Sequence, residues 1–125
     1  MKKRSRKAIV KQLDTVFSQY IRRRDSQDDM CSCSTCGVVK PIKQMQAGHF
    51  MSRGKYSTRW DEQNVHAQCQ GCNMWKQGQQ YKMSIHIDQK YGAGTAEELM
   101  NKSNRTAKFT DSDLIELINK YKNHG

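Results

Sequence analysis

Two Cys-x-x-Cys pairs are the residues of this sequence most able to do chemistry: Cys33 with Cys36, and Cys69 with Cys72. Each pair presents two thiolates from one tight turn, and two such turns complete the tetrahedral four-sulfur shell that zinc prefers. Two disulfides are the alternative, but they need an oxidising compartment, and the N-terminus carries no apolar stretch of the kind found in secretory signals. The spacing therefore predicts a structural Zn²⁺ site.

A fifth cysteine, Cys31, makes the count odd. Because Cys31-x-Cys33 is too short for an ordinary zinc knuckle, we expect Cys33 to pair with Cys36 and Cys31 to be a spare thiol. A register in which Cys31 replaces Cys33 stays open, since both lie on one Ser-rich segment. The gap between the two pairs is longer than the usual zinc-ribbon spacing, which predicts a folded element there, and a β-hairpin fits.

The stretch from the first pair to just beyond the second offers groups suited to phosphodiester hydrolysis. That reaction needs a base to activate water, a divalent cation to stabilise developing charge, and cationic groups to hold the substrate. His49 has an unperturbed pKa near neutrality and sits where a hairpin strand would aim it at a helix carrying Asn73, so we predict that it is the general base. A structural histidine, or a zinc ligand in place of a cysteine, is the alternative.

Four cations flank this predicted site and can bind phosphates: Arg53, Lys55, Arg59 and Lys76. Each of them can equally be a solvated surface charge. Two tryptophans, Trp60 and Trp75, can stack on an unpaired base, although a tryptophan beside a small zinc core is more often buried packing.

The formal net charge is +10, with 22 Lys and Arg against 12 Asp and Glu, and the pI is near 9.6. This excess predicts a polyanionic partner, first of all nucleic acid, although a basic surface can also aid solubility or contact acidic lipid. At 125 residues, of which 35% are hydrophobic, the chain is about one domain with a modest core, so zinc binding should supply part of its stability. No run approaches the apolar length that crosses a membrane, and we expect a cytoplasmic protein.

The elements that must position these groups follow from charge and hydrophobic periodicity. Residues 1–7 form a basic run that we expect to be a mobile arm contacting phosphates. Residues 8–25 predict an amphipathic helix, because apolar side chains recur at the three-and-four spacing of one face: Ile9, Leu13, Val16, Phe17, Tyr20 and Ile21. This stripe either packs on the zinc core or forms the seam of a homodimer.

Residues 31–77 hold the predicted zinc core. We expect residues 26–34 to be irregular, residues 45–51 and 60–68 to form the strands of the hairpin, and residues 72–77 to begin the helix that closes the site.

Residues 79–125 predict flanking helices. The first covers residues 79–91 with Gly92 as its C-cap; its apolar residues also alternate as in a strand, but the length of the segment favours a helix. A capping box at Thr95 opens the second, and a capping box of Thr110 and Asp113 opens the third. The expected fold class is α+β, with a zinc-stapled core and flanking α-helices in a single domain over residues 8–125.

The order of these motifs resembles that of the HNH, or ββα-metal, endonucleases. More narrowly it is similar to the NinG/Rap family of phage recombination endonucleases. The residues that carry the resemblance cover most of the chain from Lys7 onward: Tyr20-Ile21-Arg22-x-Arg24-Asp25, Gln46-Ala47-Gly48-His49-Phe50, Ser52-Arg53, Asn64-Val65-His66-Ala67-Gln68-Cys69-Gln70-Gly71-Cys72-Asn73, Gly78 and Tyr91-Gly92. The resemblance implies a ββα-metal (HNH) core in which zinc knuckles hold a hairpin and a helix around one catalytic metal.

The resemblance also implies roles for three residues. His49 activates water, Asn64 orients the catalytic histidine or its loop, and Asn73 contributes an oxygen ligand to a catalytic Mg²⁺ or Mn²⁺. The implied substrates are branched double-stranded DNA intermediates of recombination, such as Holliday junctions and D-loops.

One position departs from the pattern, because Gly48 stands where many ββα-metal enzymes carry an acidic metal ligand. Asp61, Glu62 and His66 are candidate substitutes, with His66 as the tentative choice for the same catalytic ion because it sits close to Asn64 and to the second cysteine pair. The alternative is that His66 hydrogen-bonds to a metal ligand without binding the ion, or lies at the surface. We expect His86 and His124 to be structural or solvent-facing.

Two other functions stay open. One is a non-catalytic zinc module that binds nucleic acid, and the other is an HNH nicking or homing endonuclease that acts on linear duplex. A symmetric junction favours a homodimer, for which the helix of residues 8–25 is our expected interface. If the chain is phage-encoded, it should act in the host cytoplasm, and the additional zinc-binding segment that some family members carry ahead of this region is expected to be absent.

Overall fold

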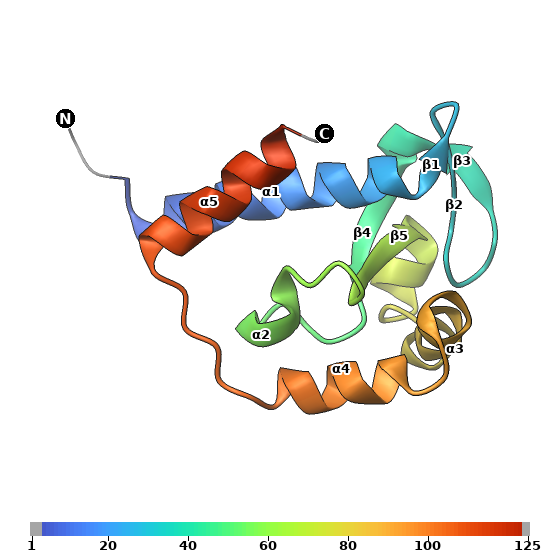
Figure 1. Cartoon of the computed structure of the whole chain (residues 1–125). Helices are drawn as coiled ribbons and strands as arrows, with labels where there is room; N and C mark the ends of the chain where they lie inside the picture. The colour runs from blue at the N-terminus through green and yellow to red at the C-terminus, as the bar shows by residue number, and fades with distance from the viewer. Residues whose placement is uncertain (1–3, 124–125) are drawn as a thin grey trace.

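The helix α1 (Arg6–Arg24) is the longest element of the computed structural model, which describes residues 4–123 (Figure 1). Ser5 caps it, because the Ser5 hydroxyl accepts a hydrogen bond from the backbone N–H of Ala8. The predicted helix is therefore confirmed and begins slightly earlier than expected. Arg6 belongs to it and binds Asp111, so the predicted arm is shorter than residues 1–7, and residues 1–3 lie outside the described part.

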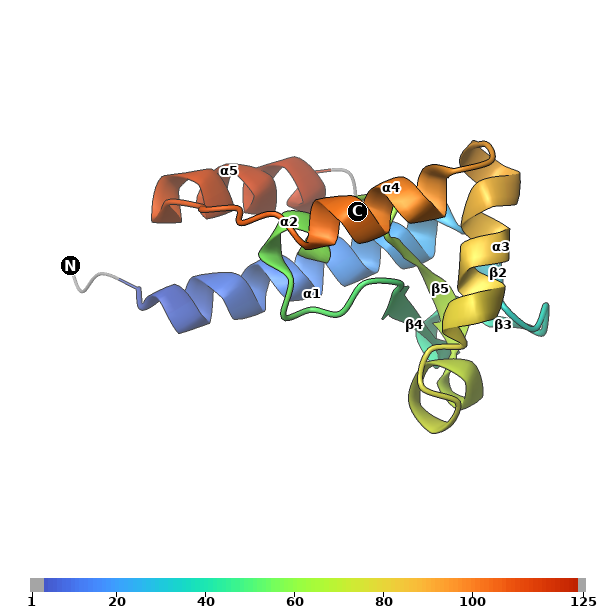
Figure 2. The same cartoon turned by 90° about the horizontal axis from the view of Figure 1, so that it is seen from below.

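The apolar face of α1 packs against α5 (Asp111–Lys122), and the two helices run side by side in both views (Figures 1 and 2). The ring centroids of Phe17 and Tyr121 are 4.8 Å apart in an edge-on contact. The predicted capping box opens α5, with Thr110 and Asp113 bonding each other's backbone N–H. Since α5 and the central hairpin cover the stripe, it belongs to the core of one chain and is not an open homodimer seam.

A hairpin of β4 (Met45–His49) and β5 (Val65–Cys69) lies between α1 and the α3–α4 pair (Figure 1). Both predicted strands are present, but the second begins at Val65, five residues later than expected. His49 is paired with Val65 in this register, and His66 with Gly48. Because side chains alternate along a strand, His49 and His66 point to opposite faces of the hairpin.

The segment predicted to be irregular is instead a second small sheet. It contains β1 (Ser26–Gln27), β2 (Met30–Ser32) and β3 (Val39–Pro41), all antiparallel. Asp28 and Asp29 turn the chain between the first two strands with φ of 52° and 62°. Asp tolerates this left-handed conformation better than most residues, and so a polar pair forms a tight hairpin turn. A short 3₁₀ turn, η1 (Ile42–Gln44), then leads to β4.

The helix predicted over residues 72–77 is only one π-type turn, η2 (Gly71–Trp75). It ends because Gln77, Gly78 and Gln79 all have positive φ, between 51° and 80°, which no right-handed helix can contain. The chain then enters α3 (Gln80–Tyr91) as a separate helix. The loop between the hairpin strands contains another short helix, α2 (Tyr56–Arg59).

The predicted helix over residues 79–91 is confirmed by α3, and Gly92 ends it with φ of 115°. The next helix, α4 (Thr95–Ser103), also exists, but the capping box predicted at Thr95 is wrong. Gly94 is the N-cap, and the Thr95 hydroxyl donates to the carbonyl of Gly92 instead. The helices α3 and α4 bury a second apolar cluster of Phe50, Met83, Ile87, Ala96 and Leu99.

The fold class is thus α+β, as predicted, with a cluster of four cysteines beside the hairpin. Within residues 4–123, no helix is both long enough and apolar enough to cross a bilayer.

Candidate functional site

The four predicted zinc ligands lie together. The sulfur atoms of Cys33, Cys36, Cys69 and Cys72 are all within 4.8 Å of one another, and those of Cys36 and Cys69 are 3.8 Å apart. A zinc ion about 2.3 Å from each thiolate places the sulfurs of a tetrahedron roughly 3.8 Å from each other. The cluster can therefore hold Zn²⁺, and it joins the small sheet to the end of the hairpin.

Two thiols of this cluster have pKa values shifted in opposite directions. Burial opposes ionisation of Cys33, but hydrogen bonds from the Thr35 side chain and from nearby backbone outweigh it and lower its pKa to about 6. A backbone hydrogen bond at Val38 lowers the pKa of Cys36, yet burial and contacts with the other thiols raise it overall to about 12. Neighbouring sulfurs cannot all carry negative charge unaided, so full ionisation needs a cation among them.

Cys31 lies outside this cluster. Its buried Sγ is 3.5 Å from the carbonyl oxygen of Asp25 at the end of α1, and burial raises the pKa of the thiol. The cluster contains Cys33 and not Cys31, so the structure has the register in which Cys33 pairs with Cys36, and a spare thiol stays our expectation for Cys31.

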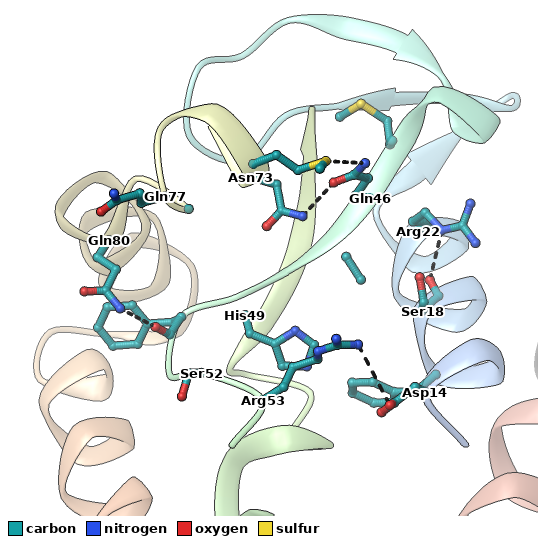
Figure 3. A pocket seen from close by; sticks show the side chains of 16 residues that line it. Asp14, Ser18, Arg22, Gln46, His49, Ser52, Arg53, Asn73, Gln77 and Gln80 are labelled. Atoms are coloured by element: carbon teal, nitrogen blue, oxygen red, sulfur yellow. Dashed lines mark hydrogen bonds and ion pairs between the residues drawn. The ribbon is translucent and has the colours of Figure 1, made fainter. Parts of the chain in front are cut away.

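A cavity of about 690 Å³ runs alongside β4 (Figure 3). The helix α1 lines one side with Asp14, Phe17, Ser18 and Arg22, and η2 with its following turn lines the other with Asn73, Met74, Gln77 and Gly78. His49 lies between these two walls, with Ser52 and Arg53 at its open end. The structure therefore brings two predicted site residues, His49 and Asn73, to one cavity.

His49 has the arrangement that a general base requires. Its Nε2 is 3.0 Å from the carbonyl oxygen of Arg59. A carbonyl only accepts, so Nε2 carries the proton and Nδ1 keeps its lone pair. Burial lowers the pKa of His49 to about 4, with the charge of Arg53 acting in the same direction, so the ring is neutral at pH 7. Within residues 4–123 Nδ1 makes no hydrogen bond, and it is not a buried atom.

Asn73 faces His49 across the cavity and offers an oxygen. Its Nδ2 donates to Gln46 Oε1 at 2.7 Å, which fixes the amide plane. The Oδ1 of Asn73 makes no hydrogen bond to the described part of the chain, so it is available to a hard cation or a phosphate-bound water.

Asn64 is fully buried and holds the loop that follows His49. Its Oδ1 accepts from the backbone N–H of Met51 at 2.8 Å, and its Nδ2 donates to the carbonyls of Met51 and Thr58. The backbone N–H of Phe50 also donates to the Asn64 carbonyl. The loop is thereby anchored directly after the predicted base, a geometry consistent with an orienting role.

Gly48 departs from the acidic pattern for a steric reason. A Cβ at this position would lie 1.8 Å from Gln68 Oε1, because the buried Gln68 side chain crosses the strand here. Gln68 Nε2 donates to Gly78 O at 2.8 Å and to Thr35 Oγ1 at 3.1 Å, so the amide links the turn after η2 to the first cysteine pair. Gln68 thus occupies the space that an acidic ligand at position 48 would need.

A family model described as Bacteriophage Lambda NinG protein matches residues 1–124 of this sequence. The chain belongs to the NinG family. It is 29% identical over 97 residues to a protein ninG of Escherichia phage 933W, a match that covers 77% of this chain and 46% of the relative. The protein ninG of Salmonella phage P22 is 29% identical over 91 residues, covering 72% of this chain and 43% of the relative. The protein ninG of Escherichia phage lambda is 28% identical over 97 residues, covering 77% of this chain and 46% of the relative.

This NinG-family chain thus spans less than half the length of the curated relatives that it matches. No solved structure matches it.

His66, the tentative metal ligand, does not line the cavity beside β4. It is fully buried on the other face of the hairpin, with Nε2 2.8 Å from the Gln63 carbonyl and Nδ1 3.2 Å from the guanidinium of Arg24. Half-buried His86 packs edge-on against it, with ring centroids 5.0 Å apart. The structure therefore does not bring His66 to Asn73, and both of its ring nitrogens already have partners. His124 lies outside the described residues.

The predicted DNA-binding cations divide into two groups. Arg53 is exposed and lines the cavity, and Lys55 and Lys76 are exposed near it. Arg59 is different, because its guanidinium forms two hydrogen bonds to the Asp14 carboxylate and lies about 5.3 Å from the Trp60 ring. It is not presented to solvent as a free phosphate ligand.

The sequence interpretation missed two charged residues of the cavity, Asp14 and Arg22. Both lie on the helix that precedes the cysteine pairs. Arg22 belongs to the stretch 20–25 that carries the resemblance, but nothing in the sequence assigns it to the site. Arg22 adds a cation opposite Asn73, whereas Asp14 is engaged by Arg59 and by the indole N–H of Trp60. Asp61 and Glu62, the other candidate metal ligands, bind Lys102 and two tyrosines instead and do not line the cavity.

Proposed function

We propose that this chain is a metal-dependent DNA endonuclease that cuts branched recombination intermediates such as Holliday junctions and D-loops. The observation that carries the hydrolytic part is His49, whose Nε2 is held by the Arg59 carbonyl while Nδ1 stays free beside a cavity that Asn73 also lines. The preference for branched DNA rests on the resemblance of the chain to phage recombination endonucleases.

The chemistry follows from these residues. Neutral His49 accepts a proton at Nδ1 from the attacking water, and the Arg59 carbonyl stabilises the resulting imidazolium through Nε2–H. Arg22 and Arg53 hold the phosphate from two sides of the cavity, and Asn64 keeps the loop after His49 in place. A bound Mg²⁺ or Mn²⁺ would stabilise charge on the phosphate and the leaving oxygen, held by Asn73 Oδ1.

The donor set of the cavity suits a loosely held ion. Asn73 and Gln46 offer neutral amide oxygens, and the one carboxylate among the described lining residues, Asp14, is already paired with Arg59. Water and a substrate phosphate would complete the shell, as is common for Mg²⁺. The same shortage of free carboxylates favours the second candidate function, a zinc module that binds DNA without cutting it.

The test is cleavage of a labelled four-way junction and of its matched linear duplex, with Mg²⁺, with Mn²⁺ and with neither. The proposal predicts metal-dependent cutting confined to the junction and abolished in His49→Ala, with binding and zinc content retained. Equal cutting of the duplex would favour a general HNH enzyme. Binding without cutting under all conditions would identify the non-catalytic module.

We also propose that the protein acts as a homodimer in the host cytoplasm, because a four-way junction presents two equivalent strands. The apolar stripe of α1 is covered by α5, so a dimer would use another surface. Sedimentation of the protein alone and with one equivalent of junction tests this, and one protomer per cut junction would contradict it.

A further inference from the structure

Three large side chains are exposed within residues 74–81, a stretch of which Met74, Gln77, Gly78 and Gln80 line the cavity. Trp75 is 78% exposed, Tyr81 is 79% exposed and Met74 is 55% exposed. They belong to η2 and to the first turn of α3, and this part of the chain lies at the lower edge of the molecule in Figure 2. Scattered exposed apolar residues are normal, but a cluster of aromatics next to a candidate active site indicates a contact surface.

The two tryptophans differ sharply. Trp60 is buried, packs edge-on against Tyr56 and donates its indole N–H to Asp14 at 3.0 Å. The alternative of buried packing therefore describes Trp60. The Trp75 side chain makes no hydrogen bond or aromatic contact within residues 4–123, so nothing in the described chain accounts for its exposed position.

The surroundings of Trp75 are basic. Between Glu62 and Asp88 the sequence contains no acidic residue, while Lys76 and Lys82 flank the aromatics. Met74 and Gln77 line the same cavity as His49, so the exposed surface continues directly into the candidate active site. We call the set of Met74, Trp75, Lys76, Tyr81 and Lys82 the aromatic rim.

We propose that the aromatic rim binds an unstacked nucleotide at the branch point of the DNA, with its base on the Trp75 ring and its phosphates beside Lys76 and Lys82. An indole offers a large flat surface to any base, and lysines neutralise the adjoining backbone. The occupant is nucleic acid because charge and ring exposure occur together, and an unpaired base is needed because bases in a continuous duplex present no free face. The inference rests on the proposed function and deepens it by naming how an open branch is distinguished from duplex.

The experiment uses zinc-loaded protein without added Mg²⁺ or Mn²⁺, so that binding is measured without cutting. The probes are a single-stranded oligothymidylate, a four-way junction and a matched duplex. Both tryptophans emit, but only Trp75 is exposed to a stacking base, so quenching that is lost in Trp75→Phe is assigned to Trp75. We expect oligothymidylate to quench the emission, Trp75→Phe to lose the quenching but keep affinity, and Trp75→Ala to bind oligothymidylate and junction about 5- to 150-fold more weakly.

Ile115→Ala is the matched control, because Ile115 is an exposed apolar residue on α5, which does not line the cavity. It should leave binding unchanged. Wild-type affinity in Trp75→Ala would overturn the proposal. So would a Trp75→Ala protein that loses self-association in sedimentation while its DNA affinity is unchanged, which would assign the rim to contacts between copies of the chain.

The two proposals fail separately. If the protein never cuts DNA but its binding depends on Trp75, the endonuclease proposal fails and the binding role of the aromatic rim stands. If the protein cuts the junction and its binding does not depend on Trp75, the endonuclease proposal stands and the role of the aromatic rim fails.

Discussion

His49 and His66 lie on opposite faces of one hairpin and differ in the state of a single nitrogen. Burial lowers the pKa of each to about 4, and each donates Nε2–H to a backbone carbonyl, of Arg59 and of Gln63 respectively. The Nδ1 of His66 accepts a hydrogen bond from Arg24, whereas the Nδ1 of His49 has no partner within residues 4–123 and lies beside the cavity. A perturbed pKa therefore does not separate a candidate base from a structural histidine here, but a free lone pair does.

The two faces also differ in how their cations are used. On the His66 face, Arg24 donates to the carbonyls of Glu62 and Val65 and forms a part-buried ion pair with Asp25. On the cavity face, within residues 4–123, the Arg22 side chain uses only its Nε, on the carbonyl of Ser18, and Arg53 is largely exposed, with one long contact of 3.9 Å to the Asp14 carboxylate. One face is a closed network that fixes α1 to β5, and the other keeps charge available for a ligand.

Zinc removal should abolish the difference between the two faces of the hairpin, and of the changes considered it should lower the free energy of unfolding most. The four-cysteine cluster joins β5 and η2 to the small sheet, so Cys69→Ser or a strong chelator should unfold the hairpin core, with structural zinc contributing roughly 10 kcal/mol. Circular dichroism with and without chelator measures this. A native spectrum and retained DNA cutting in metal-free protein would show that the cysteines do not hold the core.

Arg24→Ala and Arg22→Ala form a matched pair on neighbouring positions of α1. Removing Arg24 leaves the Asp25 carboxylate and two carbonyls without their partner, so we expect a loss of about 3–5 kcal/mol in the free energy of unfolding. Arg22→Ala should change stability by less than about 0.5 kcal/mol and instead weaken DNA binding. Urea denaturation and a binding titration separate the two, and equal stability losses would contradict the division.

Acidification should destabilise the protein through both histidines. Their pKa is about 4 when folded and 6.5 ordinarily, so between these values the unfolded chain binds protons that the folded chain does not. Stability is then constant above pH 6.5 and falls as the pH drops toward 4, by about 1.4 kcal/mol per histidine at pH 5.5. His66→Gln should reduce this slope relative to the wild type when unfolding is measured from pH 7 to 5.5. An unchanged slope would mean that His66 is not buried neutral.

Gly48→Ala tests the contact between position 48 and Gln68. The new methyl group displaces the Gln68 amide from Gly78 and Thr35, for which we expect a loss of about 1–3 kcal/mol. Combining it with Gln68→Ala removes the clash, so the double variant should cost clearly less than the sum of the single ones. Additive losses in thermal or urea unfolding would show that the Gln68 side chain does not exclude a side chain at position 48.

Local patterns predicted much of this molecule. The stripe of α1 and the Thr110–Asp113 box depend on residues close in sequence, and the two cysteine pairs carry their own turn geometry, so all three were found. The box at Thr95 failed because Gly94, with φ of 94°, takes the cap position at no steric cost. The helix after Cys72 failed because residues 77–79 turn left-handed.

The partners of the site could not be found in this way. Asp14 reaches Arg59 and Trp60, and Arg24 reaches His66, only because α1 crosses the hairpin, and no spacing in the sequence encodes that crossing. His66 was misplaced for a related reason. Its face depends on strand register, and the long loop with α2 between the strands hides the register that pairs His49 with Val65.

The most direct test of the central claim is the junction-cutting rate of His49→Gln and His66→Gln side by side, each normalised to folded, zinc-loaded protein. Both substitutions remove a buried imidazole, but only that at His49 removes a free lone pair beside the cavity. We predict a fall of about 10²- to 10⁴-fold for His49→Gln and a change of less than about threefold for His66→Gln. Equal losses in the two variants, or undiminished cutting by His49→Gln, would contradict the assignment of His49 as the base.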